Sequence, residues 1–119
     1  MRRGGALLVS VSLLAGVALA GEAHWIPNRA DVVRLERQVM PPGGYRLDSY
    51  DRAYSGTYVS GRKVIEGRWV EVERGRKPRV DVVSYEKLPD IADGGCSVVT
   101  VYYDLATAKI AGVRCNGLG

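Results

Sequence analysis

Apolar residues recur at helical spacing in one part of the chain. Three of them stand at positions i, i+3 and i+7, on one face of a helix: Val32, Leu35 and Val39. Asn28 precedes them and offers a side-chain oxygen to the free N–H groups of a first turn. Two prolines and two glycines at 41–44 cannot continue a helix. The pattern predicts one helix over 28–40, which needs a packing partner because about three turns are marginal alone.

Two runs with strand character follow, at 50–59 and 62–73, and they meet at the dipeptide Ser60-Gly61. If this dipeptide is a two-residue hairpin loop, Val59 faces Arg62 and the pairing continues outward along both strands. One face of the hairpin then gathers four large side chains: Tyr54, Tyr58, Ile65 and Trp69. A slip by one residue would move them into water. We therefore expect this register, with the aromatic face under the helix and a wetter polar face opposite.

Three further strands are predicted downstream, the last two as a second hairpin: 80–84, 96–103 and 109–115. The segments 74–79 and 85–95 lack regular alternation and are expected to be loops. These elements predict the α+β class, with one N-terminal helix packed on a four- or five-stranded antiparallel sheet.

The two cysteines, Cys96 and Cys115, belong to the strands of the second hairpin. A four-residue turn at 104–107 would place them directly opposite each other at the open end of that hairpin. Cross-strand neighbours are close enough for a disulfide after a small approach of the two strands. A spacing so unlike C-x-x-C argues against a redox pair. We predict one structural disulfide between them.

Residues 1–20 have the features of a secretory signal. The chain begins with paired arginines, continues with an almost purely apolar stretch, and closes it with small residues. Cleavage is predicted after Ala20, with Ala23 as the alternative, which leaves 21–119 as a single small globular domain. The processed protein is expected in the periplasm or outside the cell, without a transmembrane segment.

Composition restricts the chemistry open to this protein. Its 119 residues include one histidine and two cysteines, so a zinc site of four such ligands cannot be assembled. A serine or cysteine nucleophile needs a base, and the one imidazole, His24, stands near the predicted processed terminus. No catalytic residue, metal or other cofactor is predicted. Three carboxylate pairs leave a carboxylate-based glycan hydrolase as an alternative: Asp48 with Asp51, Glu71 with Glu73, and Asp90 with Asp93.

The densest charge in the chain is the basic loop 74–79, which holds four cations and no acidic residue: Arg74, Arg76, Lys77 and Arg79. Such a cluster suits contact with an anionic partner. Nucleic acid is not expected, because removal of residues 1–20 leaves positive and negative charges nearly balanced.

These features together predict a non-enzymatic exported bacterial protein. We expect it to bind an anionic envelope component or another exported protein through the basic loop. A small secreted inhibitor of an extracellular hydrolase is the alternative, because disulfide-linked domains of this size commonly fill that role.

Overall fold

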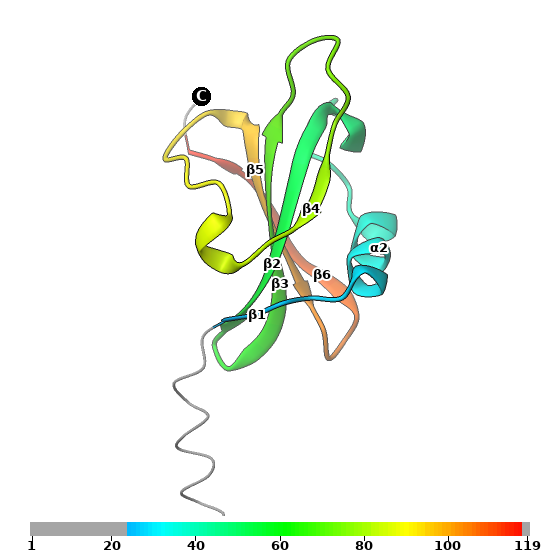
Figure 1. The fold of residues 1–119 in the computed structure, drawn as a ribbon, viewed down its shortest axis with the longest axis vertical. Helices are drawn as coiled ribbons and strands as arrows, with labels where there is room; N and C mark the ends of the chain where they lie inside the picture. Colours follow the sequence, from blue (N-terminus) through cyan, green and yellow to red (C-terminus); the bar gives the residue numbers. More distant parts are fainter. Residues whose placement is uncertain (1–23, 118–119) are drawn as a thin grey trace, which may run out of the picture.

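The computed structural model describes residues 24–117, so the predicted signal segment 1–20 and both cleavage sites lie outside the described residues. Six strands, one α-helix and two short 3-10 helices follow one another along this part of the chain (Figure 1). Their bounds are β1 His24–Trp25, α2 Arg29–Gln38, a 3-10 helix Leu47–Ser49, β2 Tyr50–Val59, β3 Arg62–Glu71, β4 Val80–Val82, a 3-10 helix Tyr85–Lys87, β5 Gly95–Asp104 and β6 Lys109–Asn116. The α+β class is confirmed.

The six strands form one sheet. Five of them follow an antiparallel path in the order β1-β2-β3-β5-β6, and β4 pairs in parallel with β2. Along the free side of β2, β1 pairs with Gly56 and Thr57, whereas β4 pairs with residues 52–54. The expectation of four or five antiparallel strands is therefore wrong in number and partly in direction. The chain leaving β3 crosses the start of β2 and returns beside it, and the residues before the helix add β1.

The helix begins where its sequence signals predicted. The Asn28 side chain accepts a hydrogen bond from the Asp31 backbone N–H at 2.9 Å, as an N-cap does. The helix ends two residues earlier than predicted, because Val39 is extended and its N–H closes the last turn on the Leu35 carbonyl at 3.0 Å. Strand β1 precedes it, so the helix is not the first element of the described chain.

The predicted register of the first hairpin is confirmed. Every pair matches, from Val59 opposite Arg62 to Tyr50 opposite Glu71. The loop residue Ser60 has φ of 51° and Gly61 has φ of 77°, the left-handed pair that twists a two-residue loop to fit its strands. Strand β3 ends at Glu71 rather than at residue 73.

The aromatic face of the sheet lies under the helix. Its largest side chains are completely enclosed, and Val32 and Leu35 of α2 pack on them. The enclosed sheet residues are Tyr50, Tyr54, Ile65, Trp69, Val99, Val101 and Tyr103. Tyr58 was expected in this cluster but remains 41% exposed. It stands near the far end of β2, where Trp25 of β1 instead covers Gly56.

A buried polar cluster joins α2 to the sheet beneath it. The Glu36 carboxylate accepts hydrogen bonds from Arg52 Nε at 2.7 Å and from the Tyr54 hydroxyl at 2.6 Å. Trp69 Nε1 donates to the same hydroxyl at 3.1 Å. Burial is the main cause that raises the pKa of Tyr54 well above its usual range, so its hydroxyl keeps its proton.

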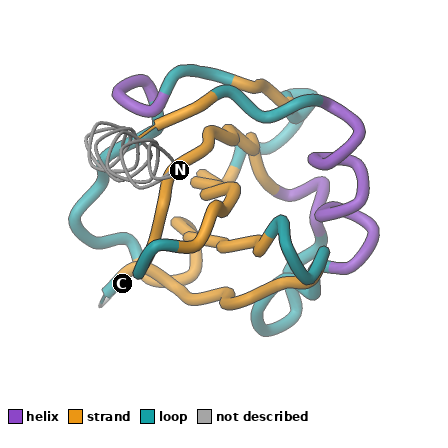
Figure 2. The backbone as a smooth tube through the Cα atoms, turned by 90° about the horizontal axis from the view of Figure 1, so that it is seen from below, coloured by secondary structure: helices purple, strands orange, loops and turns teal. Residues whose placement is uncertain are grey.

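The opposite face of the sheet is the wetter one, as expected, because Arg62 is exposed and Asp51 and Arg68 are half-buried, but much of it is closed to solvent. Ser55 and Thr57 are buried there, and Glu66 is only 2% exposed. The segment after β4 returns across this face and buries Leu88 against it. Its Tyr85 hydroxyl donates to Glu66 at 2.9 Å. In Figure 2 the curved strands lie between the purple helix α2 and the loop segment that follows β4.

The disulfide between Cys96 and Cys115 is confirmed, with the two Cα atoms 4.5 Å apart. Its setting is less regular than predicted. The turn occupies residues 105–108, and register shifts in the β5–β6 pair place Val99 opposite Cys115. The pair Gly95 and Asn116 keeps the alignment expected at the open end of the hairpin.

Removal of this disulfide should destabilise the fold without changing it. Closing a loop across the sequence separation of 19 contributes about 3 kcal/mol in the chain-entropy account. We expect a Cys96→Ala/Cys115→Ala variant to lose about that much free energy of unfolding in urea titrations. A loss below about 0.5 kcal/mol would show that the unfolded chain gains little freedom without the bridge.

Candidate functional site

The basic loop projects beyond the ends of the strands, between β3 and β4 (Figure 1). All four predicted cations are exposed: Arg74, Arg76, Lys77 and Arg79. The structure therefore brings them together at one tip of the molecule, where solvent and large partners have access.

The carboxylate of Asp51 on β2 holds this loop in place through its contacts with Arg76 and Arg79, which we call the brace. It forms an ion pair with Arg76 and accepts a hydrogen bond from the Arg79 backbone N–H at 2.9 Å. The Arg79 guanidinium lies 3.6 Å from the same carboxylate. The hydrogen bond from Arg76 is the main cause that lowers the pKa of Asp51. Asp51 therefore stays ionised at neutral pH and fixes the returning half of the loop.

The brace divides the loop cations into two kinds. Arg76 and Arg79 share the charge of Asp51, whereas Arg74 and Lys77 have no ion-pair partner among residues 24–117. These last two side chains are the ones free to meet an external anion.

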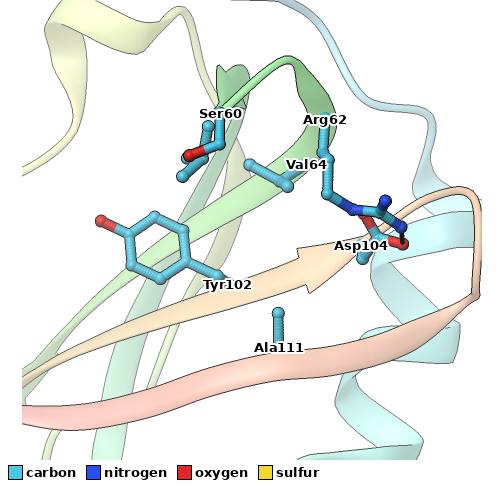
Figure 3. A pocket seen from close by; sticks show the side chains of 7 residues that line it. Ser60, Arg62, Val64, Tyr102, Asp104 and Ala111 are labelled. Atoms are coloured by element: carbon cyan, nitrogen blue, oxygen red, sulfur yellow. Dashed lines mark hydrogen bonds and ion pairs between the residues drawn. The ribbon is translucent and has the colours of Figure 1, made fainter.

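A hollow of about 300 Å³ lies near the other end of the sheet, on the face away from α2 (Figure 3). The ring of Tyr102 stands on one side of it and the Arg62–Asp104 ion pair on the other (Figure 3). The remaining lining is mostly aliphatic: Val59, Ser60, Val64 and Ala111. This hollow is an apolar depression with a fixed polar rim.

Asp104 orders that rim. It accepts two hydrogen bonds from Arg62, Nε to Oδ1 at 2.9 Å and Nη2 to Oδ2 at 2.7 Å. Thr107 adds its backbone N–H at 3.0 Å and its hydroxyl at 2.8 Å. Arg62 first, and then Thr107, hold the pKa of Asp104 well below its usual range. The carboxylate is fully engaged within the fold, whereas the Arg62 side chain remains 56% exposed.

Two further carboxylates, Asp48 and Glu66, are also held by arginines. Asp48 accepts two hydrogen bonds from Arg46, and the buried Glu66 accepts one from Arg68 Nε at 2.6 Å. The hydrogen bond from Arg46 lowers the pKa of Asp48. A general acid needs the opposite shift, because it must keep its proton near neutral pH.

His24 lies at the start of β1, where its ring stacks on Tyr85 with 4.0 Å between the ring centroids. Within residues 24–117, no three side chains of the types His, Cys, Asp and Glu come together as a metal site. None of the described helices is long and apolar enough to cross a membrane.

The sequence pattern missed two parts of these surfaces. In the sequence Asp51 is one polar residue of an alternating strand, and its partner Arg76 is 25 positions away. The rim of the hollow joins Arg62 to Asp104 across 42 positions. The sequence shows only that charged residues lie near the ends of predicted strands. It does not show which residues they pair with.

Comparison with known protein families, with curated proteins and with solved structures finds no match for this chain. The function must therefore be argued from the geometry of these surfaces.

The brace is open to a direct test by proteolysis. An Asp51→Asn variant should release the loop, so that trypsin cleaves after Arg74 and Arg76 several-fold faster. Limited digestion followed by mass spectrometry measures the rates. The control is Asp48→Asn, which removes an exposed arginine-paired carboxylate outside the loop. Equal rates in both variants would mean that Asp51 does not hold the loop.

Asp104 gives the stability of the fold a defined dependence on pH. Its pKa is lower in the folded state than in the unfolded chain, where it is about 3.9. The ionised Asp104 therefore contributes fully to the free energy of unfolding above about pH 3.9, and this contribution is lost as the pH falls toward the folded pKa. We expect Asp104→Asn to lower the free energy of unfolding at pH 7, and to lower it by a smaller amount at about pH 3. Urea titrations at both pH values measure the difference, and a constant difference would contradict the assignment.

Proposed function

We propose that this chain is an exported, non-enzymatic binding module that attaches to an anionic surface of the bacterial envelope through the basic loop. The observation that carries the proposal is the brace at Asp51. It fixes the loop with one carboxylate and leaves Arg74 and Lys77 exposed at the projecting tip.

Charge at a fixed, projecting position is suited to a broad anionic surface. Each basic side chain near an anionic membrane contributes about 1 kcal/mol, and the attraction fades within a Debye length of about 10 Å at 0.1 M salt. A loop held in advance also loses less conformational freedom on binding than a free one. The loop should therefore bind through its several cations acting together.

The disulfide supports the proposed location. Bridges such as Cys96–Cys115 form and persist in oxidising compartments, which include the bacterial periplasm and the cell exterior. In this proposal the predicted signal 1–20 is removed after Ala20 or Ala23, and the domain 21–119 acts in one of these two places.

The hydrolase alternative gains less support. A retaining or inverting glycosidase pairs an ionised carboxylate with a protonated one. Arg46 and Arg76 lower the pKa values of Asp48 and Asp51, which favours the ionised form of both groups. The inhibitor alternative predicts a stoichiometric complex with an enzyme that does not depend on the basic loop.

Co-sedimentation with phosphatidylglycerol-containing vesicles tests the proposal. Binding should fall steeply between about 0.05 and 0.5 M NaCl. An Arg74→Glu/Lys77→Glu variant keeps the brace at Asp51 and should bind at least about 30-fold more weakly, since about 2 kcal/mol of attraction is removed.

A matched control comes from the exposed face of the helix. Arg29→Glu/Arg37→Glu changes the net charge equally but lies outside the loop, so it should retain most of the binding. Binding that resists salt, or that both double variants lose alike, would contradict a contact through the loop. Phosphatidylcholine vesicles should not bind the protein.

A further inference from the structure

Strand β6 forms an edge of the sheet that no other strand covers among residues 24–117. Gln38 of the helix donates to the Ala108 carbonyl at 2.8 Å, one residue before the strand begins. At the other end, the Asn116 side chain reaches the carbonyls of Ile91 and Asp93. The backbone between these two points is an open row of donors and acceptors, the arrangement that accepts an added strand.

Two small residues stand beside the hollow on this edge strand. Ala111 lines the hollow, at the point where the β5–β6 register shifts. A side chain added at Gly112 would meet no atom within 4 Å, and the φ of this glycine is not left-handed. At Gly56, in contrast, an added Cβ would fall 2.2 Å from the ring of Trp25. The fold itself does not require Gly112, which lies opposite Tyr102 of the hollow and leaves open space beside it.

The hollow suits one apolar side chain. Val59, Val64 and the ring of Tyr102 supply most of its lining, and its volume of about 300 Å³ lies at the small end of the range for ligand pockets. In strand addition the backbone bonds provide affinity, while pockets for alternate side chains provide specificity. An apolar residue on an added strand would enter the hollow across Ala111 and Gly112.

The charge on the edge selects the chemistry of the partner. Lys109 and Arg114 are exposed and lie on the hollow side of β6, paired with Asp104 and Thr100 of β5. The strand itself carries no acidic residue, and Asp104 is already engaged by Arg62. Two copies paired through β6 would gather four cations in one ribbon without any carboxylate, which disfavours self-association.

We propose that β6 binds an extended acidic segment of a partner protein as an added strand, with one apolar side chain of that segment in the hollow. This surface is separate from the basic loop. Its test therefore does not depend on the envelope contact, and either proposal can fail without the other.

The probe is a blocked peptide of about nine residues, which is within the usual range of strand lengths and close to the length of β6. It carries leucine at the centre, glutamate two positions away on each side, and threonine elsewhere, so that the leucine and glutamates share one face. We expect NMR titration to give a Kd below about 1 mM, with slower amide exchange at alternate residues of β6. Replacing the leucine by serine, or both glutamates by lysine, should weaken binding at least about tenfold.

Gly112→Val tests the path into the hollow. Valine suits a strand, so the variant should unfold at the same or a higher urea concentration while binding the peptide at least about tenfold more weakly. Gly44→Val is the matched control, because an added side chain there also meets open space. It should bind as the unaltered protein does, and so should Arg74→Glu/Lys77→Glu.

Three results would overturn the proposal. One is absence of binding at about 1 mM peptide. Another is that the leucine and serine peptides bind equally, or that Gly112→Val binds the leucine peptide as tightly as the unaltered protein does. The third is a dimer in sedimentation equilibrium that the peptide does not dissociate, since the edge would then belong to a second copy.

Discussion

The Glu36 carboxylate is the contact on which the arrangement of helix and sheet depends. It lies between α2 and β2, where it pairs with the buried Arg52 and accepts a hydrogen bond from the Tyr54 hydroxyl. Arg52 in turn donates to the Leu47 carbonyl at 2.7 Å and so fixes the chain between helix and sheet. A buried guanidinium without its carboxylate is costly, by about 3–5 kcal/mol when such a pair is broken. The apolar contacts of Val32 and Leu35 bring the helix to the sheet, and this ionic contact sets its position.

Burial of both faces of the sheet explains why so many charged side chains are paired. The segment after β4 covers the second face, so Glu66 needs Arg68 and Tyr85 as partners. The basic loop lies at one end of β3, and the hollow with its Arg62–Asp104 rim lies at the other. Ten strand residues separate these ends, or about 30 Å. In the two proposals above, one end rests on an anionic surface and the other receives a partner.

Local sequence determined the elements and much of the pairing. Asn28 marked the start of the helix, Ser60-Gly61 set the register of the first hairpin, and the two cysteines were correctly joined. Each of these features depends on residues that are near in the chain or on a very small choice of partners. The basic loop was found in the same way, although its role in binding remains a prediction.

Tertiary structure alone decided which polar residues are buried and which charges are free. The alternation of β2 and β3 resembles a sheet with one wet face, and nothing local indicates that a later segment will cover that face. The brace from Asp51 to Arg76 and the rim from Arg62 to Asp104 join residues that only the strand order brings together. The open edge of β6 depends likewise on the final order of the strands. The sequence by itself thus determined the local elements, because their signals act over a few residues. The hold of Asp51 on the basic loop, the hollow and the open edge required the tertiary structure, because they arise where distant segments meet.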